Sequence, residues 1–194
     1  GGGAGGVAGA GRSVGACEEA GVGMGLGHER RLEPAMQEIA RLVASGDLGT
    51  IMHVESNFSH DKLANLDGDN WRVSTKESPA AAMTATGIHT TDAYISMFGA
   101  IEQVFAMAAT RNPANANGDV LTFSVKFKSG ATGAFNSVLE TPLYLRFAVY
   151  GSKAWVEARR PPCWMWCKAA MDILPKLAAI FRSVQMADLL TTHR

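Results

Sequence analysis

The sequence predicts an α+β fold in which helices pack on one face of an open, mainly antiparallel β-sheet. Two helical patterns support the helical part of this prediction, because apolar residues recur at helical spacing in residues 34–46 and again from Ile88 to Phe98. The sheet is predicted from residues 103–158, where short runs alternate between apolar and polar side chains. Strands at such short spacing pair antiparallel, since a parallel pair needs a long crossover connection.

Length and charge limit the classes of protein and partner. The 194 residues are enough for one domain with a substantial core but leave little room for two full domains. Eighteen Lys and Arg residues balance eighteen Asp and Glu residues, so net charge gives no reason to expect nucleic acid or an anionic membrane as a partner. There is no run of ~18 apolar residues that could span a membrane, no signal-peptide pattern, and no disulfide framework among the three cysteines. We therefore expect a soluble, cytoplasmic protein.

The N-terminal residues 1–15 are almost all Gly, Ala, Ser and Val, and this composition predicts a flexible, poorly packed arm. The first six residues match the dinucleotide-binding pattern Gly-x-Gly-x-x-Gly by letter, but that motif requires a preceding strand, and none is seen. Residues 16–21 are expected to end a helix with the last glycine as its C-cap, and residues 22–26 to form a short strand.

The next two elements have clear boundaries. Pro34 suits the first turn of a helix, and Gly46 is placed to end it. In residues 50–60 a mainly apolar set of side chains then alternates with a mainly polar set, which predicts a half-buried strand. The apolar face of the helix carries Met36, Ile39, Leu42 and Val43.

A polar loop is expected over residues 61–79, and it carries Trp71 and Arg72. An aromatic ring beside a guanidinium group could bind a sugar or a phosphate. The alternative is that Trp71 holds the loop against the core. Both interpretations stay open at this stage.

Residues 78–99 contain the best candidate site. Small residues as far as Gly87 allow a tight bend or a close approach to a ligand, and a helix then begins at Ile88. His89 and Asp92 are three residues apart, so they share one helix face next to an N-terminal turn that favours negative charge. These two side chains could hold a polar ligand, or they could form a local structural pair.

The sheet strands are expected at residues 103–110, 121–128, 131–140, 143–150 and 154–158, with a hairpin turn at Ser129-Gly130. The face opposite the helices is predicted to be too apolar to stay bare, and a broad apolar face usually marks an interface. We therefore expect a homo-oligomer that forms through this open face. The residues assigned to it are Asn136, Leu143, Leu145, Phe147 and Val149.

The tail, residues 159–194, is expected to be irregular around residues 161–167 and to carry an amphipathic helix that starts near Pro175. This helix could pack on its own sheet, dock on a partner or lie on a membrane surface. Three loosely spaced metal-ligand donors do not make a zinc site, so no metal is expected. These donors are Cys163, Cys167 and His193, and the apolar stripe of the helix is Ile173, Leu177, Ile180, Phe181 and Val184.

Three segments carry a resemblance to a known family. Residues 87–92 read Gly-Ile-His-Thr-Thr-Asp, residues 27–34 read Gly-His-Glu-Arg-Arg-Leu-Glu-Pro, and residues 44–51 contain a Gly-x-x-Gly turn. In this order and spacing they resemble the Gfo/Idh/MocA oxidoreductases, which act on sugars and related polyols with NAD or NADP. The likeness covers roughly Ala16 to Ala158.

The resemblance implies a domain division. Residues 1–15 would be a Gly-rich flexible arm, residues 16–30 the remnant of the end of a Rossmann domain, residues 31–158 the substrate and oligomerisation domain, and residues 159–194 a tail. The rest of the Rossmann domain, including its catalytic lysine segment, has no counterpart here. Family members commonly form dimers or tetramers through the sheet, in agreement with the oligomer predicted above.

The resemblance also implies roles for individual residues. His89 would be the base or orienting residue at the substrate hydroxyl, with Asp92 behind it and Arg31 lining the same cleft. Trp71 and Arg72 are further substrate-binding candidates. The family often has an Asp four residues before the histidine, where this chain has Ala85.

Two functions from different classes follow. The first is the C-terminal domain of an NAD(P)-dependent oxidoreductase that acts on a sugar, polyol or related carbinol by hydride transfer. The alternative is a non-catalytic ligand-binding or oligomerisation module derived from that family. No cofactor-binding residue is assigned, and the choice between NAD and NADP stays open because the residue that usually decides it follows the second Rossmann strand.

Overall fold

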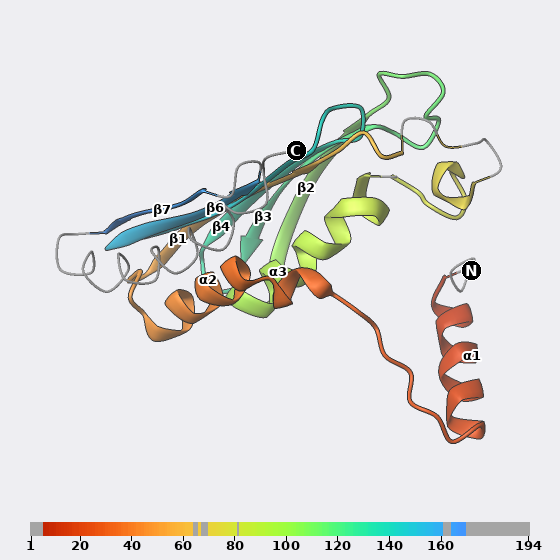
Figure 1. The fold of residues 1–194 in the computed structure, drawn as a ribbon, viewed down its shortest axis with the longest axis horizontal. Helices are drawn as coiled ribbons and strands as arrows, with labels where there is room; N and C mark the ends of the chain where they lie inside the picture. The colour runs from red at the N-terminus through yellow and green to blue at the C-terminus, as the bar shows by residue number, and fades with distance from the viewer. Residues whose placement is uncertain (1–5, 64–65, 67–69, 81, 161–163, 170–194) are drawn as a thin grey trace, which may run out of the picture.

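The computed structural model describes residues 6–63, 66, 70–80, 82–160 and 164–169 (Figure 1). Two helices lie side by side on one face of a sheet, while a third helix stands apart at the end of an extended segment (Figure 1). The helices are α1 (Gly6–Glu19), α2 (Pro34–Ser45) and α3 (Ile88–Phe98), with short helical turns η1 (Glu29–Leu32), η2 (Trp71–Val73) and η3 (Met83–Gly87). The strands are β1 (Ile51–Ser59), β2 (Ile101–Ala109), β3 (Val120–Phe127), β4 (Thr132–Val138), β5 (Tyr144–Gly151), β6 (Ala154–Arg160) and β7 (Trp164–Ala169).

Seven strands of the described residues form one sheet in the order β2-β3-β4-β1-β5-β6-β7. Strands β1 and β4 pair parallel, and every other neighbouring pair in this order is antiparallel. The predicted α+β class with a mainly antiparallel open sheet is therefore confirmed. The predicted hairpin at Ser129-Gly130 joins β3 to β4, and Gly130 takes the positive φ of 91° that favours glycine.

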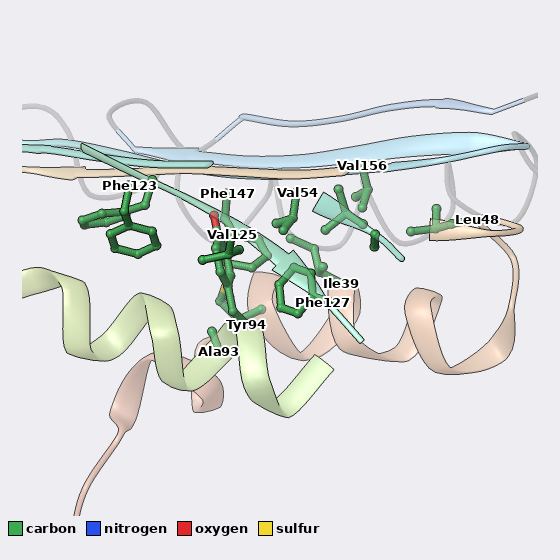
Figure 2. Packing of buried hydrophobic residues seen from close by; sticks show 14 of the residues in the cluster. Ile39, Leu48, Val54, Ala93, Tyr94, Phe123, Val125, Phe127, Phe147 and Val156 are labelled. Atoms are coloured by element: carbon green, nitrogen blue, oxygen red, sulfur yellow. The ribbon is translucent and has the colours of Figure 1, made fainter. Parts of the chain in front are cut away.

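The core lies between the sheet and the pair α2 and α3 (Figure 2). Helix α2 buries its predicted apolar stripe, and Ile39 at its centre is fully buried. Burying one such side chain contributes about 1.5–3 kcal/mol, so the periodic stripe supplies much of the free energy that holds the helix. On the sheet side the buried aromatic residues are Phe123, Phe127, Phe135 and Phe147.

Tyr94 connects α3 to the sheet through its hydroxyl group. The Tyr94 hydroxyl donates a hydrogen bond to the Ala134 carbonyl at 2.7 Å and accepts one from the Ser56 hydroxyl at 2.7 Å. Burial raises the pKa of Tyr94 well above its usual value of 10.0, because the ionised phenolate would lose its solvation. The side chain is therefore a neutral anchor that fixes α3 on β1 and β4.

The structure corrects two predictions about the N-terminal region. The predicted flexible arm is helical from Gly6 onward, and α1 stays exposed along most of its length. The C-terminal end of α1 is capped by Gly21 as predicted. Gly21 has a φ of 67°, and the Val22 N–H donates a hydrogen bond to the Cys17 carbonyl. Residues 22–26 do not form the predicted strand: they are extended, but a strand needs a neighbouring strand to satisfy its backbone groups.

The open face of the sheet also differs from the prediction. Leu145, Phe147 and Val149 lie on the helix side and are at most 7% exposed. The reason is register: Phe147 pairs with Ser56 and Val149 with Val54, on the face that α2 and α3 cover. The open face of β1, β5 and β6 instead carries a charged network, in which Arg146 bonds to Glu55 at 2.6 Å and to Glu157 at 2.7 Å.

In the tail, residues 164–169 form the regular strand β7, although irregular chain was predicted there. The reason is antiparallel pairing with β6, which no local pattern shows. The predicted amphipathic helix near Pro175 lies outside the described residues. No helix in the described ranges is long and apolar enough to span a membrane.

Candidate functional site

A π-helical turn, η3, leads directly into α3 and positions His89. Within this turn Thr86 is fully buried, and its hydroxyl bonds to the Ala82 carbonyl at 2.6 Å and to the Ser137 hydroxyl at 2.9 Å. The second contact ties the turn to β4. Such π turns are rare and often occur at functional sites, where they displace a side chain from regular helical spacing.

Asp92 is the best-connected residue of the predicted site. Its two carboxylate oxygens accept hydrogen bonds from Arg31 Nε at 2.5 Å and from Arg31 Nη2 at 2.6 Å. The hydrogen bond to Asp92 raises the pKa of the Arg31 guanidinium group above its usual value. The local pair between His89 and Asp92 is not formed, since Asp92 is held by η1, which precedes it by about sixty residues in the chain.

His28 and Glu29 complete the cluster, and the sequence did not single out either residue. His28 Nε2 lies 3.9 Å from the Asp92 carboxylate, and Glu29 Oε2 lies 3.9 Å from His89 Nδ1. The rings of His28 and His89 meet edge to face, with their centroids 6.0 Å apart. Nothing in the local spacing connects these residues to α3, although both belong to the segment of residues 27–34 that carries the family resemblance.

A cavity of about 240 Å³ opens beside His89. Its walls are β1, β5 and β6 on one side and the starts of α2 and α3 on the other, and most of its lining is apolar. Arg30 reaches this cavity, where its guanidinium group lies 4.8 Å above the Phe58 ring and its Nη1 lies 2.8 Å from Glu33 Oε1. A mostly apolar cavity with a few polar groups can bind the ring of a small hydroxylated molecule.

The structure separates the predicted site residues into two groups. His89, Asp92 and Arg31 come together, with Arg31 lining a groove between α2 and α3 and His89 lining the cavity. Trp71 and Arg72 stack on each other in η2, with 4.4 Å between the Arg72 guanidinium carbon and the Trp71 ring, and neither is among the residues that line the cavity.

The loop that carries Trp71 and Arg72 is fastened by a residue of the β2–β3 connection. The Asn117 side-chain amide donates hydrogen bonds to the Arg72 carbonyl at 2.8 Å and to the Ser78 carbonyl at 3.0 Å. This attachment holds the loop through backbone groups, so the Trp71 and Arg72 side chains are not needed to anchor it at these two points.

Within the described ranges, no group of three or more His, Cys, Asp and Glu side chains could hold a metal ion. Of the donors weighed in the tail, Cys163 and His193 lie outside the described residues. The ion pairs beside the cavity include Arg31–Asp92 and Arg30–Glu33.

Comparison with known proteins identifies the class to which this fold and site belong. Residues 36–157 match the family model described as the GFO/IDH/MocA C-terminal domain. The match covers more than half of the chain, so the chain belongs to the Gfo/Idh/MocA family. None of the curated proteins compared matches it.

Solved structures share the fold at low sequence identity. Levoglucosan dehydrogenase in complex with NADH and L-sorbose is 17% identical, with a TM-score of 0.66 over 75% of this chain and 43% of that chain. The WlbA dehydrogenase from Bordetella pertussis, in complex with NADH and UDP-GlcNAcA, is 24% identical, with a TM-score of 0.67 over 76% and 44%. An NAD-binding oxidoreductase from Klebsiella pneumoniae is 20% identical, with a TM-score of 0.69 over 82% and 46%. The present chain thus spans less than half the length of these proteins.

Proposed function

We propose that this chain supplies the substrate-binding and oligomerisation domain of an NAD(P)-dependent oxidoreductase that acts on a sugar, polyol or related carbinol. The observation that carries the proposal is the cavity beside His89 within a Gfo/Idh/MocA C-terminal fold. Structures with this fold were solved with NADH together with L-sorbose or UDP-GlcNAcA, which supports a sugar-like substrate.

His89 is proposed as the general base. Oxidation of a carbinol removes a hydride from carbon and a proton from the hydroxyl group, and a histidine near a cavity is suited to take the proton. Asp92 and Arg31 hold the start of α3 against η1 and so keep His89 in place. Trp71 and Arg72 are proposed to contact the more distant part of a larger substrate.

The described residues do not fit the dinucleotide itself. A dinucleotide site needs a strand, a glycine-rich turn and a helix in a parallel βαβ unit. In the described residues the parallel pair β1 and β4 is separated by α3, β2 and β3, and the helix α1 follows no described strand. We therefore assign no residue of this chain to NAD(P), and we propose that residues 16–30 are the end of a Rossmann domain.

A second candidate is a ligand-binding or oligomerisation module without redox chemistry. The two candidates differ in whether a nicotinamide cofactor takes part. Titration of the purified 194-residue chain with NADH and NADPH, followed by tryptophan and nicotinamide fluorescence, is the first test. Saturable binding supports the oxidoreductase. The absence of binding up to about millimolar concentration means that this chain is the family's C-terminal domain without its cofactor half, and titration with sugars and polyols then tests its ligand-binding role.

The role of His89 has its own test. If the chain turns over a polyol, His89→Ala is expected to lower kcat by about 10²–10⁴-fold, the usual contribution of a general base. His53→Ala is the matched control, because His53 lies on the opposite face of the sheet and bonds to Thr132. An equal loss of activity in both variants would contradict the assignment of His89.

A further inference from the structure

His89 has a buried ring nitrogen that lacks a hydrogen-bond partner. The atom is Nδ1, and within the described residues it is one of three buried side-chain N or O atoms in this state, together with His28 Nδ1 and Asn117 Oδ1. A buried polar atom without a partner costs free energy, so such atoms in a folded protein call for an explanation. Two of the three lie in the cluster beside the cavity.

Glu29 is the carboxylate that faces this nitrogen. Glu29 Oε2 lies 3.9 Å from His89 Nδ1, about 1 Å longer than a hydrogen bond. The Glu29 side chain is 68% exposed, so it can change rotamer without disturbing the core. Catalytic hydrogen bonds are often long in ligand-free structures and shorten when the substrate binds.

We propose that Glu29 is the positioning residue of His89. Its carboxylate accepts a hydrogen bond from the Nδ1–H group of His89, and this fixes the tautomer in which Nε2 carries no proton and can take the proton of the substrate. The protonation of one ring nitrogen is set by the hydrogen bond that the other makes. This inference rests on the proposed function, because it assigns the geometry of the same base.

The other carboxylates near His89 are already engaged. Asp92 accepts hydrogen bonds from Nε and Nη2 of Arg31 and faces His28 Nε2, and Glu33 is paired with Arg30. Glu29 has no such cation among the ion pairs of the described residues, and its one charged approach is to His89. Two histidine–carboxylate approaches therefore link this segment to α3. His28, just before η1, faces Asp92 of α3, and Glu29, the first residue of η1, faces His89 of α3.

Histidine ¹⁵N chemical shifts test this inference in the whole chain without cofactor. Spectra are recorded at about pH 9, where an ordinary imidazole is neutral and the two tautomers are distinguishable. His89 is assigned by its loss in His89→Gln. We expect His89 in the wild-type chain to carry its proton on Nδ1. Glu29→Gln keeps an acceptor oxygen and should retain that tautomer, whereas Glu29→Leu should lose it.

Glu102→Leu is the matched control, because Glu102 is an exposed carboxylate on β2 that pairs with Lys126. His28 is an internal reference, since its Nε2 faces Asp92 instead of Glu29. A proton on Nε2 of His89 in the wild-type chain, or an unchanged tautomer in Glu29→Leu, would overturn the inference. These spectra need no turnover, so their failure is distinct from a failure of sugars and polyols to bind, which would count against the proposed function.

Discussion

At the residue scale, single polar groups decide how α3 meets the sheet. Tyr94 is the clearest case, because it places a hydroxyl group inside an aromatic core and satisfies it twice. A phenylalanine at this position would fill the same volume. The two contacts are thus not required for packing; they fix the position and orientation of α3, and with it the side chain of His89.

Replacing Tyr94 by Phe is expected to destabilise the fold by about 1–3 kcal/mol, because the Ser56 hydroxyl and the Ala134 carbonyl lose a buried partner. Urea unfolding followed by circular dichroism measures this change. Tyr144→Phe, at a partly exposed position, is the control and should change the free energy of unfolding by less than about 0.5 kcal/mol.

The same residue predicts a pH dependence. Burial raises the pKa of Tyr94 in the folded state, so above pH ~10 the unfolded chain releases a proton that the folded chain retains. The contribution of Tyr94 to stability is therefore full below pH ~10 and falls as the pH rises further. The difference in stability between the wild-type chain and Tyr94→Phe should shrink from pH 9 to pH 11, and a constant difference would contradict this.

At the scale of elements, turns and strand pairs depend on a few positions with special geometry. Helix α2 ends at Gly46, which has a φ of 75°. The turn after α2 packs closely against the β5–β6 hairpin. Leu48 lies in this turn, and its carbonyl is so near Gly151 that a Cβ at Gly151 would collide with it. The end of α2 is therefore held both by its own cap and by the sheet.

Gly46→Ala should lower the free energy of unfolding by about 1 kcal/mol, since alanine is strained at positive φ. Thermal or urea unfolding gives the value. Gly23→Ala is the matched control, because Gly23 lies in an extended segment with open space around it and no positive φ. Equal destabilisation by both substitutions would show that the cap geometry is not the cause.

The charged network on β1, β5 and β6 gives an element-scale prediction. Arg146→Met leaves Glu157, which is 6% exposed, with Arg159 as its remaining partner. We expect a loss of about 2–3 kcal/mol, because an incompletely paired buried carboxylate is costly. Adding Glu157→Gln should recover part of it. Lys126→Met removes one partner of an exposed ion pair and should cost less than about 1 kcal/mol in the same unfolding assay.

At the scale of the whole molecule, the sheet has one face covered by helices and one edge that is largely apolar. Strand β2 lies at the end of the strand order, and Val104, Phe105 and Met107 on it are at least 64% exposed. Exposed apolar strands at a sheet edge favour association. The homo-oligomer expected from the sequence stays a prediction. Among the described residues the exposed apolar side chains at the sheet edge lie on β2, whereas Leu145, Phe147 and Val149 of β5 are buried.

We expect the chain to form a homo-oligomer at micromolar concentration, measured by light scattering or sedimentation. Phe105→Glu should shift it toward the monomer, because a charge would be buried in the contact. Gln103→Glu on the same strand is the control and should have a smaller effect. A wild-type chain that is monomeric at tens of micromolar would contradict the prediction.

The sequence by itself determined α2, α3 and the strands β1 to β6, because helical and strand periodicity are local properties that each of these segments carries alone. The boundaries of α2 follow from Pro34 and Gly46, and the alternation of apolar and polar side chains in β3 identifies its buried face. The family resemblance, carried by three short segments, is also contained in the sequence and is confirmed by the match over residues 36–157.

Tertiary structure alone decided which surfaces meet. The face on which Phe147 lies depends on its register with β1, and a shift of one residue would reverse it. The partner of Asp92 is Arg31, and Glu29 faces His89, across about sixty residues of intervening chain. Such contacts depend on the packing of η1 against α3, which no local pattern in either segment specifies.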